Sequence, residues 1–331
     1  MVIISKGIYL YLEMNYRIII SWMILVGSFS CQRILEPETD NWESGIHQMT
    51  LAHDGLDRTY TVYIPEGFDE NRVYPLVLIL HGGGGTADLV IENDNWLATA
   101  DEQKFIAVFP DGSRNDMESS ASFNTNPQTW NDGSERTSIG AVVRQVDDVG
   151  FIESLIFKMK DTLSIDNDMI FATGFSNGSS MTFRLARELP NVFEAVAPVA
   201  GSDWMQQLVP DTNPPRLLYI TGTEDPLNPF EGGDIFIGNT YIGTKPDVEE
   251  MILPWTDLLS CENGFTTDTQ QDIRTYQFDC TESEQLKMLA LIGHGHHWPG
   301  SESSLPFAVV GENATSLNAN DVIWEFFSAS F

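Results

Sequence analysis

The chain has 331 residues, 42% of them hydrophobic, which is enough to bury the core of one large domain. Its 48 acidic residues against 17 basic ones give a formal net charge of −31. This balance excludes nucleic acid and an anionic membrane surface as partners, because both would repel the chain. The acidic residues are spread along the sequence, as is typical of a solvated surface.

Residues 1–30 are predicted to be a targeting segment with its true start at Met14. A basic residue precedes an apolar run, Ile18 to Val26, that is too short to span a bilayer comfortably, and mostly small residues follow. The segment resembles a bacterial lipoprotein signal that ends at an acylated Cys31, although Phe29 departs from the usual small residue. The alternative is an ordinary secretory signal. Either signal predicts an extracytoplasmic chain whose only membrane contact would be an N-terminal lipid anchor.

Residues 31–45 are polar and contain Pro37, so we expect a tether there and a folded domain over residues 46–331. Within that domain, short apolar runs alternate with helical patterns. Several runs are apolar throughout, which is typical of strands covered by helices on both faces. The predicted strands are Tyr60–Ile64, Leu76–Leu80, Phe105–Phe109, Met169–Thr173, Ala195–Val199, Leu217–Thr221 and Leu286–Leu291.

Two helices are predicted most clearly. Residues 148–163 place Phe151, Leu155 and Met159 at helical spacing, and the segment after Ser176 repeats this pattern. Strands that alternate with helices predict an α/β fold with a mostly parallel central sheet flanked by helices on both faces.

The segment Gly174-Phe175-Ser176-Asn177-Gly178 predicts a nucleophile at a strand-to-helix turn. An apolar strand leads into it and a helical pattern leads out. Such a sharp turn exposes the serine hydroxyl, and the flanking glycines relieve the crowding. The helix N-terminus beside the serine favours developing negative charge. A purely structural turn is the alternative interpretation.

A serine nucleophile needs a base, and in this architecture the order along the chain is Ser, acid, His. After Ser176 the only histidines are His294, His296 and His297. We expect His296 to be the base, because it lies in a Gly-His-x-Trp-Pro-Gly loop that follows an apolar strand. The other two are interpreted as loop surface or supporting residues. A metal-binding histidine cluster is less favoured, because no matching carboxylate or cysteine spacing accompanies it.

The acid is expected between the serine and the histidine, at the end of a strand. Leu217–Thr221 supplies the strand, and Asp225 follows it in a turn, where it can orient the imidazole. Glu224 is the rival. An oxyanion hole needs two backbone N–H groups. We expect them from Asn177 and from Gly83, in the glycine run after His81.

The ordered motifs resemble the polyhydroxybutyrate depolymerase-like esterases, which are related to the feruloyl and acetyl xylan esterases of carbohydrate esterase family 1. The resemblance extends from about Thr61 to Gly300. It rests on the following segments: Leu80–Gly85, Val146–Phe151, Gly174–Gly178, Ala197–Gly201, Gly222–Pro226 and Gly295–Gly300.

This resemblance implies an α/β-hydrolase fold with Ser176, Asp225 and His296 as the catalytic residues. It also implies a bond between Cys261 and Cys280, a pair that would bridge in an oxidising compartment in any case. The tentative substrate-binding residues are Trp130, Trp298 and His81.

The chain departs from the polyester depolymerases in having Gly83 where they typically have a cysteine, and no polymer-binding domain follows. Both differences favour acyl or feruloyl esters of polysaccharides over polyhydroxybutyrate as the substrate. The sequence therefore predicts a serine ester hydrolase that needs no metal or organic cofactor. The alternatives are a polyester depolymerase, a peptidase or acyltransferase on the same scaffold, and a non-catalytic carbohydrate-binding surface lipoprotein.

Overall fold

The computed structural model describes residues 42–204, 213–282, 284–301 and 307–329. The predicted targeting segment, Cys31 and most of the predicted tether lie outside these residues. The fold begins slightly before residue 46, because Trp42 already packs against the core and the first strand starts at Gly45. Across these ranges, no helix is both long enough and apolar enough to cross a bilayer.

The strands of the described chain are β1 (Gly45–His53), β2 (Leu56–Ile64), β3 (Tyr74–Leu80), β4 (Ile106–Pro110), β5 (Ile165–Phe175), β6 (Ala195–Val199), β7 (Arg216–Gly222), β8 (Gly233–Ile237), β9 (Thr240–Lys245), β10 (Thr266–Gln270), β11 (Ile273–Gln277) and β12 (Leu286–Leu291). The helices are α1 (Ala87–Asn93), α2 (Trp96–Gln103), α3 (Gly140–Val143), α4 (Asp148–Thr162), α5 (Asn177–Glu188), α6 (Val248–Ile252), α7 (Pro254–Leu258), α8 (Phe307–Val310) and α9 (Ala319–Ser328).

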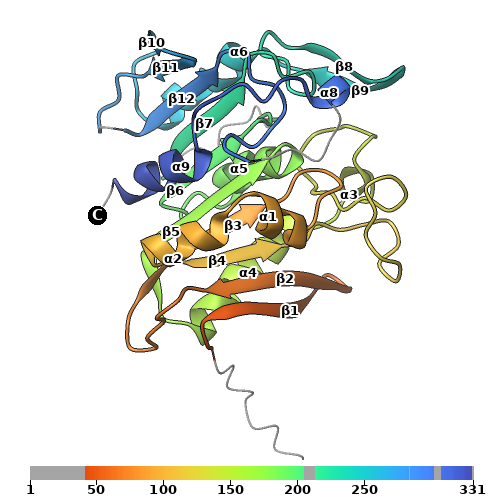
Figure 1. Cartoon of the computed structure of the whole chain (residues 1–331), viewed down its shortest axis with the longest axis vertical. Coiled ribbons are helices and arrows are strands. Elements are labelled where there is room, and N and C mark those ends of the chain that lie inside the picture. The colour runs from red at the N-terminus through yellow and green to blue at the C-terminus, as the bar shows by residue number, and fades with distance from the viewer. Residues whose placement is uncertain (1–41, 205–212, 283, 302–306, 330–331) are drawn as a thin grey trace, which may run out of the picture. The chain divides into compact units, whose positions relative to one another are not determined.

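The described residues form one large sheet with the strand order β1-β2-β4-β3-β5-β6-β7-β12-β11-β10 (Figure 1). The strands from β4 to β12 in this order are parallel. Antiparallel strands extend the sheet at both edges, and β8 and β9 form a separate hairpin. Every predicted strand is present, and the predicted α/β-hydrolase fold is confirmed.

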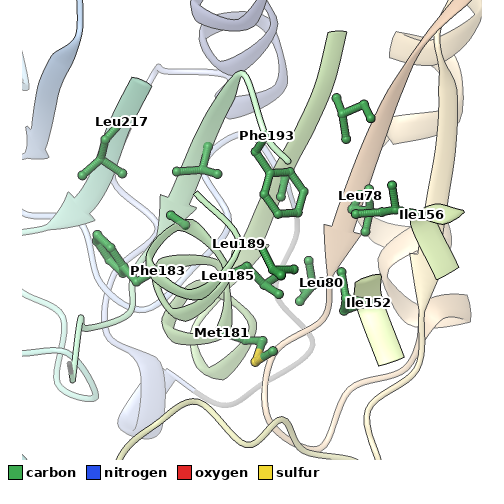
Figure 2. Packing of buried hydrophobic residues seen from close by; sticks show 14 of the residues in the cluster. Leu78, Leu80, Ile152, Ile156, Met181, Phe183, Leu185, Leu189, Phe193 and Leu217 are labelled. Atoms are coloured by element: carbon green, nitrogen blue, oxygen red, sulfur yellow. The ribbon is translucent and has the colours of Figure 1, made fainter. Parts of the chain in front are cut away.

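Two hydrophobic cores cover the two faces of the sheet, which explains the uninterrupted apolar strands. In β3, Leu76, Leu78 and Leu80 face one core, while Val77 and Ile79 face the other. The first core contains residues of α4 and α5, including Ile152, Ile156 and Met181, which point at the sheet (Figure 2). The second contains residues of α1, α2 and α9.

A disulfide bond joins Cys261 and Cys280, as predicted. The two cysteines also form an antiparallel bridge of the backbone. Cys261 precedes β10 and Cys280 follows β11, so the bond closes the base of the β10–β11 hairpin. This hairpin lies at one edge of the large sheet.

Candidate active site

Ser176 lies between β5 and α5, with a backbone conformation (φ 55°, ψ −116°) that few residues other than glycine adopt. The flanking positions must be glycine because a side chain would clash with the backbone there. A Cβ at Gly174 would lie 2.6 Å from the carbonyl oxygen of Gly178, and a Cβ at Gly178 would lie 2.4 Å from that of Leu80. The Ser176 amide donates to the Val199 carbonyl at 2.9 Å, which ties the turn to β6. The predicted strand-turn-helix arrangement is therefore present.

The side chains of Ser176, His296 and Asp225 meet at the carboxyl ends of β5, β7 and β12. His296 Nε2 lies 2.8 Å from Ser176 Oγ, and His296 Nδ1 lies 2.7 Å from Asp225 Oδ2. Asp225 is 2% exposed and His296 4% exposed. With the proton on Nδ1 donated to the carboxylate, Nε2 is free to accept the serine proton.

Asp225 is itself held in place by the backbone. Its Oδ1 accepts the amides of Leu227 and Asn228, both at 2.8 Å. The rival Glu224 is exposed to solvent. The structure therefore places Asp225, and not Glu224, beside His296.

The two neighbouring histidines have other contacts. His294 Nε2 lies 3.3 Å from the His297 carbonyl, and its Nδ1 accepts the Ala314 amide at 3.3 Å. Burial lowers the pKa of His294 below its ordinary value. His297 donates through Nε2 to the Gly311 carbonyl at 3.0 Å. Within the described ranges, the His, Cys, Asp and Glu side chains form no group of three that could hold a metal ion.

The predicted oxyanion amides lie together. A Cβ at Gly83 would be 3.5 Å from the Cβ of Asn177, so the glycine loop packs directly on the residue after the serine. Among the described residues, neither amide donates a hydrogen bond. Gly84 and Gly85 do donate, to the carbonyls of Gln128 and Gly82, and these bonds fix the loop. Two unused donors next to a serine hydroxyl can stabilise a negatively charged oxygen.

No sequence pattern predicts the contacts that hold Asn177. Its Oδ1 accepts the Trp130 amide at 2.7 Å, and its Nδ2 donates to Asp132 Oδ2 at 2.9 Å. Asp132 in turn pairs with Arg136 at 2.5 Å. These contacts fix the first turn of α5 and hence the direction of the Asn177 amide.

Of the other two predicted substrate-binding residues, His81 lines the pocket described below and Trp130 does not. Trp130 is fully buried, and its Nε1 donates to the His81 carbonyl at 2.9 Å. His81 is 1% exposed, donates through Nδ1 to the Gly82 carbonyl and accepts the Gly112 amide at Nε2. Burial lowers the pKa of His81 below its ordinary value. Through these hydrogen bonds, both side chains hold the start of the glycine loop in place.

A pocket of about 160 Å³ opens beside His296 and the glycine loop. Trp298, predicted to line the substrate site, is one of its walls, and the Trp298 Nε1 donates to Asn320 Oδ1 at 2.9 Å. Most of the exposed surface of the pocket is apolar, although polar side chains also line it. The lining residues outside the glycine loop are Thr86, Leu89, Val90, Asn93, Asp94, Phe123, Phe175, His296, His297, Trp298 and Ser301.

Comparison with known proteins agrees with this geometry. Residues 54–215 match the family described as "Putative esterase". The chain is 28% identical over 294 residues to "Probable feruloyl esterase C" of Aspergillus niger, covering 87% of each chain. It is 26% identical over 279 residues to feruloyl esterase C of Emericella nidulans, covering 82% of this chain and 84% of that one.

The fold is similar to that of acetyl xylan esterase from Aspergillus awamori, with a TM-score of 0.57 and 14% identity. That match covers 86% of this chain and 99% of the other. Together, the fold and the matches define a carboxylic ester hydrolase. More particularly, the chain is similar in sequence to feruloyl esterases, one of the groups that the motifs predicted.

Proposed function

We propose that this esterase works through an acyl-serine intermediate. His296 accepts the proton of Ser176 Oγ while the oxygen attacks the ester carbonyl, and the amides of Gly83 and Asn177 stabilise the oxyanion. Protonated His296 then gives its proton to the leaving alcohol. In the second half, His296 deprotonates a water molecule that attacks the acyl-serine; the bond to Ser176 Oγ then breaks, His296 returns the proton to Oγ, and the carboxylic acid leaves. Asp225 keeps the imidazole oriented and stabilises its charged form.

The observation that carries this proposal is the position of His296, which contacts Ser176 Oγ with one ring nitrogen and Asp225 with the other. The expected test result is that Ser176→Ala lowers kcat by several orders of magnitude without unfolding the protein. Hydrolysis of 4-nitrophenyl acetate measures this, with Ser120→Ala, a change at an exposed serine, as the matched control.

A fluorophosphonate probe gives a second readout, because only an activated serine reacts. The native enzyme should be labelled and the Ser176→Ala variant should not. Normal hydrolysis by that variant, or no labelling of the native enzyme, would refute the acyl-serine proposal. An unlabelled and inactive native chain would instead indicate a carbohydrate-binding protein.

The proposed substrates are acyl or feruloyl esters of polysaccharides. The names of the relatives from Aspergillus niger and Emericella nidulans, both feruloyl esterases, support this class. A polyester is the alternative, and the glycine at position 83 weighs against it. Methyl ferulate, acetylated xylan and short hydroxybutyrate oligomers, compared at equal enzyme concentration, separate these substrates.

The proposed location is outside the cytoplasm. The Cys261–Cys280 disulfide supports an oxidising compartment. Attachment to a membrane through an acylated Cys31 is part of the proposal, since the apolar run and small residues before that cysteine fit a lipoprotein signal. Mass spectrometry of the mature N-terminus tests it: a diacylglyceryl cysteine supports the anchor, and an unmodified terminus contradicts it.

A further inference from the structure

A second pocket, with a volume of about 500 Å³, lies between residues 133–138 and strand β9. Trp204 and residues 241–244 form the rest of its lining, and it shares no lining residue with the pocket beside His296. Its volume is within the range of roughly 300–1,000 Å³ that is typical of ligand sites. The proposed cleavage steps give this second pocket no role.

The second pocket adjoins the segments that hold the nucleophile. Asp132 accepts the side-chain amide of Asn177 at 2.9 Å and also pairs with Arg136, which lines the second pocket. On another segment, Trp204 follows Gly201 by three residues, and a Cβ at Gly201 would lie 2.5 Å from the carbonyl oxygen of the catalytic serine. Both segments therefore lead from the site of cleavage into the second pocket.

The β8–β9 hairpin, which supplies one wall of the second pocket, is fixed to the rest of the domain. It projects beyond the large sheet (Figure 1). Ser138 Oγ donates to the Ile242 carbonyl at 2.9 Å, which joins the 133–138 segment to β9. Lys245, the buried last residue of β9, donates to Ser202 Oγ at 3.1 Å. These bonds hold the wall in a defined position relative to the active site.

The hairpin presents two aromatic side chains to solvent. Phe236 and Tyr241, the hairpin aromatics, are each 54% exposed, and their ring centroids lie 5.8 Å apart in an edge-to-face arrangement. The Tyr241 hydroxyl lies 2.8 Å from Thr244 Oγ1, which donates to Asp234 at 2.6 Å. Because these contacts already orient the Tyr241 ring, it loses little further entropy on binding. Exposed and oriented aromatic rings favour contact with an apolar face of a ligand.

The second pocket also offers hydrogen-bonding groups. Arg136 directs Nε to Ser134 Oγ at 3.2 Å and Nη2 to Asp132, whereas its Nη1 has no partner among the described residues. Its guanidinium lies 4.5 Å from the centre of the Trp204 ring. Glu135 adds an exposed carboxylate. A donor, an acceptor and aromatic rings together match a sugar, which carries hydroxyl groups around its rim and C–H groups on its faces.

We propose that the second pocket and the hairpin aromatics bind the saccharide chain that carries the ester. A sugar ring stacks on Tyr241, and sugar hydroxyl groups bond to Arg136 and Glu135. The inference rests on the proposed function, because it assigns the alcohol side of the same site. Since none of these side chains touches the reacting atoms, the saccharide site contributes to the recognition of oligomeric and polymeric substrates and not to the cleavage of small esters.

The test compares two esters of one acid, methyl ferulate and a feruloylated arabinoxylan oligosaccharide. Tyr241→Ala should lower kcat/KM for the oligosaccharide ester by roughly 5- to 20-fold, mainly through KM, because a stacking contact is lost. The value for methyl ferulate should stay the same. Tyr241→Phe, which keeps the ring, should retain most of the preference for the oligosaccharide ester.

Phe157→Ala is the matched control, because Phe157 is a 72% exposed aromatic residue of α4 that does not line the second pocket. It should leave kcat/KM for both esters unchanged. Equal kcat/KM values of the native enzyme and Tyr241→Ala for the oligosaccharide ester, or equal losses on both esters, would overturn the saccharide site.

Electrophoresis in native gels that contain arabinoxylan gives a readout that does not depend on cleavage. The polysaccharide should retard the native enzyme and Ser176→Ala alike, and should retard Tyr241→Ala less. Equal mobility of the native enzyme with and without arabinoxylan would contradict the proposal. Retardation together with Ser176-independent hydrolysis would instead refute the acyl-serine mechanism and leave the saccharide site in place, so the two proposals fail separately.

Discussion

Around Ser176 the backbone is crowded and strained. At the edge of the sheet, by contrast, β10 is polar and exposed to solvent, and a disulfide bond closes the base of the β10–β11 hairpin. At the site, the serine has a positive φ and the neighbouring glycines leave no space for a side chain. At the edge, every residue of β10 is exposed, and a disulfide holds the base of the hairpin. The comparison teaches that the centre of the sheet provides geometry for catalysis while its edge provides stability.

The largest expected effect is at the centre. Asp225→Asn should lower kcat by about 10⁴, because an amide that donates towards His296 Nδ1 favours the wrong tautomer. The melting temperature should change little, since Asn keeps the shape of the side chain. Steady-state kinetics and thermal unfolding measure both. Glu224→Gln, at the adjacent exposed carboxylate, is the control and should keep native kcat. Comparable losses in both variants would contradict the assignment of the acid.

At the edge, the effect should be on stability. Replacing both Cys261 and Cys280 by serine should lower the free energy of unfolding by about 3 kcal/mol, as expected for a loop of this length. The kcat should stay within about twofold of native, because the hairpin contributes no catalytic group. Urea unfolding with and without reductant checks this, as reductant should destabilise only the native protein. A large loss of kcat with unchanged stability would contradict the conclusion that this edge of the sheet contributes stability and not catalysis.

The smallest expected effect concerns the free energy of unfolding, which the buried carboxyl group of Asp94 should lower at neutral pH. Because burial raises the pKa of Asp94 to about 7, the folded state binds a proton that the unfolded state has released between about pH 4 and pH 7. Stability is therefore lost as pH rises through this range, by about 1–2 kcal/mol after allowance for partial exposure. Asp94→Asn should remove this loss. Urea unfolding at pH 4.5 and 8 tests it, and parallel pH dependences of the two proteins would contradict it.

The central strands and the meeting of Ser176, Asp225 and His296 could be predicted because each has a local signal. A strand buried on both faces, such as Leu76–Leu80, is continuously apolar. The nucleophile follows such a strand and lies between glycines that the turn requires. All the histidines after Ser176 lie in one short loop, so the base had to be one of them.

The edge strands could not be predicted in this way, because both faces of β10 are exposed and its residues Thr-Thr-Asp-Thr-Gln carry no apolar pattern. Of the pocket walls, Trp298 was predicted, but the wall formed by α1 was not. Helix α1 lines the pocket only because the fold places it beside the glycine loop, and Trp130 is buried because distant segments of the chain pack around it. Tertiary contacts of this kind leave no periodicity in a single sequence.

The direct pairing of β7 with β12 has a consequence for how such enzymes can diversify. Gly222 and Leu291 are register partners at the ends of these strands, so the loops that carry Asp225 and His296 start side by side. The chain between them forms the β8–β9 hairpin, α6, α7 and the disulfide-closed hairpin. Helices α6 and α7 pack into the core, so the parts of this segment that can change in length while acid and base stay in place are the two hairpins. The hairpins are therefore where new recognition surfaces can be added.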